Sequence, residues 1–262
     1  MKESAAVQVR DYFETIEGCR THILRAGQGQ PLLFLHGANG GRWLPFLADL
    51  ARDFDVIAPE HPGFGTSDTP EWLDNMGDLA HFYLEFIDKL SLDNVIIVGT
   101  SLGGWLGCEM ATRSTQKLDR LVLAAPAGIH VKGVQKGDMF LWNPEQMTRN
   151  LFHSVELQER MLAMPMSDED RDMGLRNRFT TAKLAWAPRL YNPDLAKWLH
   201  RIRIPTLILW GKQDKLIPVA YGDAFQKLIP GSTLKVFDEC GHLPHAEKSA
   251  DYVSAIREFV KG

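Results

Sequence analysis

The chain has 262 residues, of which 45% are apolar and 24% are charged, and its formal net charge is −4. This composition is typical of a soluble globular protein, and the length suffices for one large α/β domain with one modest insertion. A mild negative charge without a Lys/Arg-rich run argues against nucleic acid as a partner.

The N-terminal residues 1–6 contain no apolar stretch of the kind that marks a secretory signal peptide. No uninterrupted apolar run reaches about 18 residues, so we expect no membrane-spanning segment and no membrane partner. Three widely spaced cysteines, Cys19, Cys108 and Cys240, suggest neither a metal site nor a disulfide framework. We therefore expect a cytoplasmic protein whose chemistry requires no metal or other cofactor.

Short apolar runs follow one another along the chain. Residues 12–16 and 19–25 alternate around Glu17-Gly18 and predict an opening β-hairpin. Helix-like segments such as residues 79–90, with an apolar stripe at a period of 3.6, separate most of the later runs. This alternation predicts an α/β fold with a mostly parallel, twisted, eight-stranded sheet and helices on both faces. The later strand-like runs are residues 32–35, 56–58, 95–98, 121–124, 207–210 and 234–237.

One interval, residues 129–202, breaks this rhythm because it contains no strand-like run. It is rich in Met and Trp, and a structureless loop of roughly 70 residues would be unusual in a compact domain. We interpret it as a helical lid, inserted between two parts of a core domain at 1–128 and 203–262. Most of its apolar residues would pack the lid itself, and some would line an apolar substrate pocket. The pocket candidates in the lid are Met139, Trp142 and Trp186.

A serine in the pattern Gly-x-Ser-x-Gly, residues 99–103, directly follows the run at 95–98 and precedes a helix-like segment. A strand that turns this sharply into a helix brings the two backbones almost into contact, so the flanking positions need glycine. The turn holds the serine at a strained angle with its hydroxyl exposed. The pattern alone is a weak signal, but in this context it predicts that Ser101 is a nucleophile.

Serine is a weak nucleophile at neutral pH and needs a base within hydrogen-bond reach. Among the nine histidines, His242 is favoured because it follows the run at 234–237 and so lies at the same sheet edge as Ser101. His245 is its main rival, and the role of His61 stays open because it also lies on a loop after a strand. Structural or surface roles are expected for His22, His81, His153 and His200.

The base in turn needs an acid that orients the ring. Asp214 follows the run at 207–210 and is our candidate. Asp223 is expected on the following helix, and Asp238 lies too close to His242 in sequence to reach its far nitrogen easily. The other strand end where an acid could stand, after residue 124, carries no carboxylate.

Two backbone amides are expected to form an oxyanion hole. The N–H of Leu102 begins the helix after the serine, where the helix dipole favours negative charge. The loop after residues 32–35 carries three glycines in six residues, which lets backbone approach a ligand closely. We favour the Ala38 N–H as the second donor, with Asn39 as a less favoured contributor and a pocket candidate. Each such donor is typically worth about 3–4 kcal/mol in the transition state.

The order Ser, Asp, His resembles that of the α/β-hydrolase superfamily and differs from the two other common serine-protease orders. The resemblance covers nearly the whole chain outside the lid and implies the α/β-hydrolase fold with a serine-type active site. A serine nucleophile separates the chain from the haloalkane dehalogenases and epoxide hydrolases, which share only the scaffold. The motifs that carry the resemblance are residues 36–37, 62–67, 99–104, 210–214 and 241–242.

Within the superfamily the chain is somewhat similar to the carbon–carbon bond hydrolases of aromatic degradation. Those enzymes usually have Asn before the serine and Trp after the histidine, where this chain has Thr100 and Leu243. The expected activity is therefore hydrolysis of a small, largely apolar carboxylic ester through an acyl-enzyme.

Two alternatives remain. Carbon–carbon cleavage of a ring-fission diketone would use the same triad, with a lid arginine holding the substrate carboxylate. A non-catalytic binding protein could also use this fold. The sequence leaves monomer and homodimer equally open. The lid arginines in question are Arg176, Arg178 and Arg189.

Overall fold

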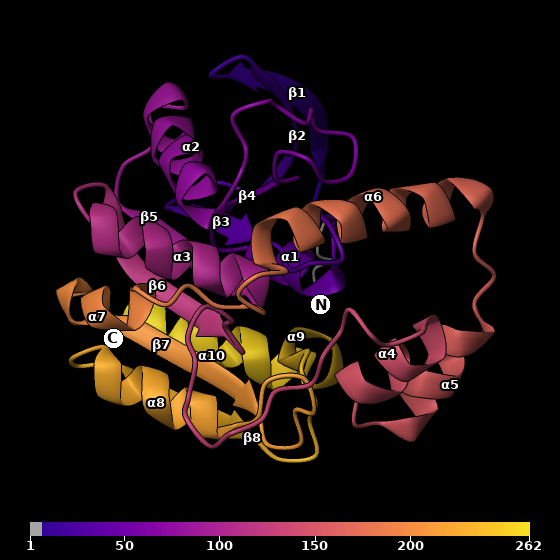
Figure 1. Cartoon of the computed structure of the whole chain (residues 1–262). Coiled ribbons are helices and arrows are strands. Elements are labelled where there is room, and N and C mark those ends of the chain that lie inside the picture. The colour runs from indigo at the N-terminus through magenta and orange to yellow at the C-terminus, as the bar shows by residue number, and fades with distance from the viewer. Residues whose placement is uncertain (1–6) are drawn as a thin grey trace, which may run out of the picture.

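The computed structural model describes residues 7–262, and within them the chain forms one sheet of eight strands (Figure 1). The order across the sheet is β1-β2-β4-β3-β5-β6-β7-β8. β2 is antiparallel to both β1 and β4, and all other neighbours are parallel. The predicted hairpin and mostly parallel eight-stranded sheet are confirmed. The strands are β1 (Arg10–Ile16), β2 (Cys19–Ala26), β3 (Pro31–Leu35), β4 (Asp55–Pro59), β5 (Val95–Thr100), β6 (Leu118–Ala124), β7 (Thr206–Gly211) and β8 (Thr233–Phe237).

Helices cover both faces of this sheet. α2, α3 and α8 bury their apolar residues in one core cluster, whereas α1 and α10 bury theirs in the other. The central strands read as continuous apolar runs because both of their faces are buried. In β5, for example, Val95 and Ile97 contact the first cluster, and Ile96 and Val98 contact the second. The core helices are α1 (Pro45–Leu50), α2 (Met76–Lys89), α3 (Leu102–Arg113), α8 (Ala220–Leu228), α9 (Pro244–Glu247) and α10 (Ser249–Lys261).

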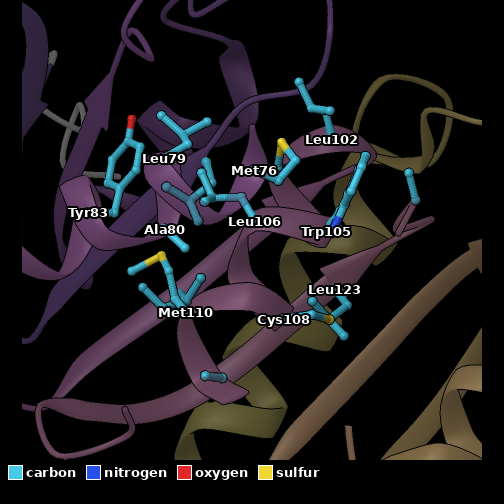
Figure 2. Packing of buried hydrophobic residues seen from close by; sticks show 14 of the residues in the cluster. Met76, Leu79, Ala80, Tyr83, Leu102, Trp105, Leu106, Cys108, Met110 and Leu123 are labelled. Carbon is cyan, nitrogen blue, oxygen red and sulfur yellow. The ribbon is translucent and has the colours of Figure 1, made fainter. Parts of the chain in front are cut away.

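The helix α2 begins at Met76, three residues before the predicted start at residue 79. The reason is a capping box, in which the Asn75 side chain accepts from backbone N–H groups of the first turn and the Asp78 carboxylate accepts from the Asn75 N–H. The apolar stripe of α2 packs against α3, the helix that follows Ser101. Figure 2 shows this packing, with Met76, Leu79, Ala80 and Tyr83 of α2 near Leu106 and Met110 of α3.

Only helices and loops fill the long interval between β6 and β7, apart from one isolated bridge between Gly128 and Tyr191. The turn between α4 and α5 contacts the loop after β8, and α6 contacts the loops after β3 and β4. These helices therefore lie at the edge of the sheet where the parallel strands end. The exact boundaries at residues 129 and 202 stay a prediction. The helices of the interval are α4 (Pro144–Leu151), α5 (Val155–Ala163), α6 (Asp168–Ala185), α7 (Leu195–Trp198) and the short 3₁₀ helix η1 (Leu199–Arg201).

Within residues 7–262, none of the helices combines the length and the hydropathy needed to cross a bilayer. The three cysteines are all buried and free. The parallel strands β3, β5, β7 and β8 all end at the same edge of the sheet, and the loops that follow them carry the predicted site residues.

Candidate active site

The turn from β5 into α3 holds Ser101 at a positive φ, with φ 53° and ψ −113°. Such a backbone is costly for a residue with a side chain and persists only where its surroundings impose it. A Cβ added at Gly99 would lie 2.3 Å from the Gly103 carbonyl oxygen, and one added at Gly103 would lie 2.0 Å from the Leu35 carbonyl oxygen. Both flanking glycines are therefore required by contact, as the sequence pattern predicted.

The structure brings Ser101, His242 and Asp214 together. The Nε2 atom of His242 lies 2.9 Å from the Ser101 Oγ, and its Nδ1 atom lies 2.7 Å from the Asp214 Oδ2. The side chains of His242 and Asp214 are almost fully buried, with exposed fractions of 2% and 0%. The second oxygen of Asp214 accepts two backbone N–H groups at 2.8 Å, those of Leu216 and Ile217. The carboxylate is thus held on both sides, and the imidazole Nδ1–H donates to it.

The rival histidines lie elsewhere. His61 stacks on His36 with ring centroids 3.6 Å apart, and its Nε2–H donates to the His36 carbonyl while its Nδ1 accepts from the Tyr83 hydroxyl. His36 donates from Nδ1 to the Gly37 carbonyl and accepts the His61 N–H at Nε2. All four ring nitrogens of these two histidines thus have partners other than the Ser101 hydroxyl, and the rings support the loop after β3.

His245, the main rival, packs against the rings of Phe46 and Tyr252, and its Nδ1 has no hydrogen-bond partner among residues 7–262. Burial lowers the pKa of His36 and of His245 to about 4, and lowers the pKa of His61 well below 6.5. These three rings are thus neutral at pH 7, because burial disfavours their protonated, charged form.

Acid should destabilise the protein through these rings. As pH falls from 6.5 towards 4, the unfolded chain protonates its histidines while the folded state keeps these three neutral. The stability that they contribute is complete above pH 6.5 and is lost progressively towards pH 4, several kcal/mol in total. Urea denaturation at a series of pH values between 7 and 4 measures the loss.

A matched pair of variants assigns part of that loss to one residue. His245→Phe fills an aromatic site with a ring that cannot titrate, so the decline in unfolding free energy between pH 6.5 and 4 should be shallower than in the wild type. His81→Gln changes an exposed histidine and should leave the decline unaltered. Equal slopes for all three proteins would remove His245 from this role.

The two predicted oxyanion donors lie beside Ser101. Leu102 is the first residue of α3, where a helical N–H has no intrahelical acceptor. Gly37 packs on the serine, since a Cβ added there would lie 3.4 Å from the Ser101 Cβ, and Ala38 follows it. Among residues 7–262 no acceptor is bonded to the Leu102 or Ala38 N–H. Two N–H groups on the segments next to Ser101 are thus without an acceptor among these residues, and their role in an oxyanion hole stays a prediction.

The four residues predicted to line a substrate pocket differ in their burial. Met139 is buried in the core cluster, and the Trp142 ring lies over Gly137, 2.5 Å from where a Cβ would stand. Asn39 is exposed, and Trp186 is half exposed with the Arg189 guanidinium 3.7 Å from its ring centroid. A substrate-lining role for these four residues stays a prediction.

The three lid arginines are all engaged with protein groups. Arg176 donates to the Ser67 carbonyl and the Thr69 hydroxyl, and Arg178 donates to the carbonyls of Phe140 and Trp142. Arg189 stacks on Trp186 and lies 3.5 Å from the Asp138 carboxylate. Each guanidinium thus has at least one partner within residues 129–202 or in the loop after β4, although the Arg189 Nη1 is buried without a hydrogen-bond partner among residues 7–262.

Sequence reasoning missed Glu247, which joins the turn between α4 and α5 to the loop that carries His242. Its Oε1 accepts the backbone N–H groups of His153 and Ser154 at 2.8 and 2.7 Å, and its Oε2 accepts that of Gly241 at 2.6 Å. The His242 N–H donates to the Leu151 carbonyl at 2.8 Å. The only signal in the sequence is an acidic residue five positions after His242. Its position does not indicate that it bonds to His153 and Ser154, more than ninety positions earlier.

Glu247→Ala should lower the free energy of unfolding by about 2–4 kcal/mol, because three backbone donors lose a charged acceptor. Looser placement of the loop before His242 should lower kcat as well. Chemical denaturation and ester turnover measure the two effects. Glu258→Ala, which removes an exposed carboxylate bonded to the Ser254 hydroxyl, is the control and should change stability by less than about 0.5 kcal/mol. Equal losses in the two variants would contradict the assignment.

Comparison with known proteins finds one matching family model and relatives over most of the chain. Residues 32–255 match the family model described as "Alpha/beta hydrolase family". The chain is 28% identical over 264 residues to 2-hydroxy-6-oxo-2,4-heptadienoate hydrolase of Pseudomonas putida, and the match covers 93% of each chain.

Two solved structures show the same fold. One is 2-hydroxy-6-oxo-6-phenylhexa-2,4-dienoate hydrolase of a Rhodococcus species, at a TM-score of 0.80 and 21% identity, covering 98% of this chain and 100% of the other. The second is a thermophilic esterase of Thermogutta terrifontis, at a TM-score of 0.74 and 23% identity, covering 96% and 98%. At these identities the likeness concerns the fold alone.

Proposed function

Because the chain belongs to the alpha/beta hydrolase family, as its motifs predicted, we propose that it cleaves carboxylic esters with Ser101, His242 and Asp214 as catalytic triad. The observation that carries the proposal is the unbroken hydrogen-bonded series from the Asp214 carboxylate through both ring nitrogens of His242 to the Ser101 hydroxyl. A serine made reactive in this way performs acyl transfer.

The reaction has two halves. His242 takes the Ser101 proton at Nε2 as Oγ attacks the ester carbonyl, and the resulting oxyanion is stabilised by the Leu102 and Ala38 amides. The imidazolium, paired with Asp214, then protonates the leaving alcohol, and the acyl group stays on Ser101. Water repeats the same steps and releases the acid. The chain's own residues suffice for every proton transfer.

The substrate class is a small, largely apolar ester, and the lid of residues 129–202 is expected to cover it. Support comes from the lid composition and from the position of α4, α5 and α6 beside the loops that carry the site. The half-buried Trp142 and the exposed Trp186 are the aromatic side chains we expect near an acyl or aryl group.

Carbon–carbon bond hydrolysis is the second candidate, favoured by the similarity to the Pseudomonas putida heptadienoate hydrolase. A ring-fission substrate carries a carboxylate that needs a cation. All three lid arginines already have protein partners, and Thr100 and Leu243 stand where those enzymes usually carry Asn and Trp. These observations favour the ester.

A substrate panel tests the proposal. The purified protein is assayed with p-nitrophenyl esters of acyl lengths from acetate to octanoate and, in parallel, with a ring-fission diketone. Faster turnover of the esters supports the proposal, whereas a diketone preference of tenfold or more in kcat/KM would replace it with the second candidate. A fluorophosphonate probe that leaves Ser101 unlabelled would instead favour a non-catalytic binding protein.

A further inference from the structure

The lid helix α6 holds the loop that carries a predicted oxyanion donor. The Asn177 side chain, 5% exposed, donates from Nδ2 to the Asn39 carbonyl at 3.0 Å and accepts the Gly65 N–H at Oδ1 at 2.9 Å. A buried amide that makes both bonds has its orientation determined. Asn177 therefore connects two core loops, the one after β3 and the one after β4.

Gly40 of this loop lies in close contact with the Asn177 side chain. Gly40 has φ 89°, and a Cβ added there would lie 2.4 Å from the Asn177 Nδ2. One turn further along α6, the Thr181 hydroxyl lies 3.4 Å from the Ala38 carbonyl as a weak second contact. The loop after β3 thus contacts two polar side chains of α6, Asn177 and Thr181.

The loop itself is a tight turn over residues 37–40, closed by the Gly40 N–H donating to the Gly37 carbonyl at 3.2 Å. Its first residue packs on Ser101, and the carbonyl of its third residue is held by Asn177. The Ala38 N–H lies between these two fixed points. A turn held at both ends keeps its intervening amide in one direction.

We propose that Asn177 is a positioning residue of the oxyanion hole, which aims the Ala38 N–H by holding the Asn39 carbonyl; this rests on the function proposed above. Because Asn177 belongs to α6, the hole is complete only while this part of the lid lies against the core. Asn177 touches neither the substrate nor the reacting atoms, so its contribution appears in the rate of the chemical step.

The test is Asn177→Ala, assayed with the best p-nitrophenyl ester. We expect kcat to fall by about 10–100-fold, less than the loss of an oxyanion donor outright, with KM changed by less than about threefold. Phenylboronic acid forms a tetrahedral adduct with a reactive serine, and its affinity should fall by the same factor as kcat/KM. The pH midpoint of activity should not move, since the histidine and its acid are untouched.

Two further variants separate positioning from general loosening. Asn177→Asp can still accept the Gly65 N–H but cannot donate to the Asn39 carbonyl, so it should lose as much kcat as the alanine variant. Thr180→Val removes the α6 hydrogen bond to the Gly63 carbonyl, 2.7 Å, without touching the loop after β3, and should keep kcat within about twofold. Should Asn177→Ala fail to fold, the aspartate variant decides by the same criteria.

Wild-type kcat and boronate affinity in Asn177→Asp would overturn the inference, as would an equal loss in Thr180→Val. Failure of the proposed function has a different signature, since Ser101→Ala would then keep ester turnover. An inactive Ser101→Ala beside a fully active Asn177→Asp would reject the positioning role alone.

Discussion

Ser101→Ala is expected to lower kcat for the best ester substrate by about five to six orders of magnitude, the loss typical when a triad nucleophile is removed. In the proposed mechanism this hydroxyl forms the acyl-enzyme, and no other hydroxyl is bonded to the His242 Nε2 among residues 7–262. Residual turnover would come from the amides and the binding site alone. Single-turnover and steady-state assays on purified variants measure the effect.

The fold should survive this change. Alanine is as costly as serine at φ 53°, so backbone strain at the turn is unchanged, and only one hydrogen bond to His242 is lost. We expect the free energy of unfolding to change by no more than about 1 kcal/mol. Ser254→Ala, on the exposed face of α10, is the control for activity and should match the wild type. Turnover by Ser101→Ala within tenfold of the wild type would exclude Ser101 as the nucleophile.

Asp214→Asn should lower kcat by about four orders of magnitude. The backbone N–H groups of Leu216 and Ile217 both donate to Oδ1, so the amide oxygen of an asparagine must face them. The amide nitrogen then faces the His242 Nδ1 and donates to it. The ring is forced into the tautomer that carries its proton on Nε2, and it cannot accept the Ser101 proton.

A neighbouring carboxylate provides the control. Asp238 lies on the loop after β8, and its bonds to Gln213 and Lys212 lower its pKa to about 2. Asp238→Asn removes the same charge near the site without contacting His242, so kcat should stay within a few fold of the wild type. A loss in Asp238→Asn that equals the loss in Asp214→Asn would show that local charge, and not the tautomer of the histidine, matters.

The sequence predicted the main architecture well because its signals are local. Apolar runs located all eight strands, and the Gly-x-Ser-x-Gly pattern located the tight turn at Ser101, since both depend on neighbours within a few residues. The start of α2 was placed three residues late because a capping asparagine outside the apolar stripe determines it. That signal was present at Asn75 and could have been used.

Residues that act through distant partners were not predictable in the same way. Glu247 bonds to backbone more than ninety positions earlier, and Asn177 bonds to Asn39 across 138 positions. Nothing in the local sequence around either residue indicates these partners. The local sequence does not distinguish a buried asparagine from an exposed one. The burial of Asn177 is decided only when α6 packs against the core loops.

By itself, the sequence determined the strand–helix order and which loops end at the active edge of the sheet, because hydrophobic period and glycine sterics operate over short stretches of chain. Only the tertiary structure decided that His242, and not His245 or His61, meets Ser101, since these side chains are 141 positions apart and the aim of an imidazole depends on packing. The tertiary structure alone also shows that Asn177 of α6 donates to the Asn39 carbonyl in the turn that contains Ala38. Hydrogen bonds between remote segments require orientations that only the assembled sheet and its helices provide.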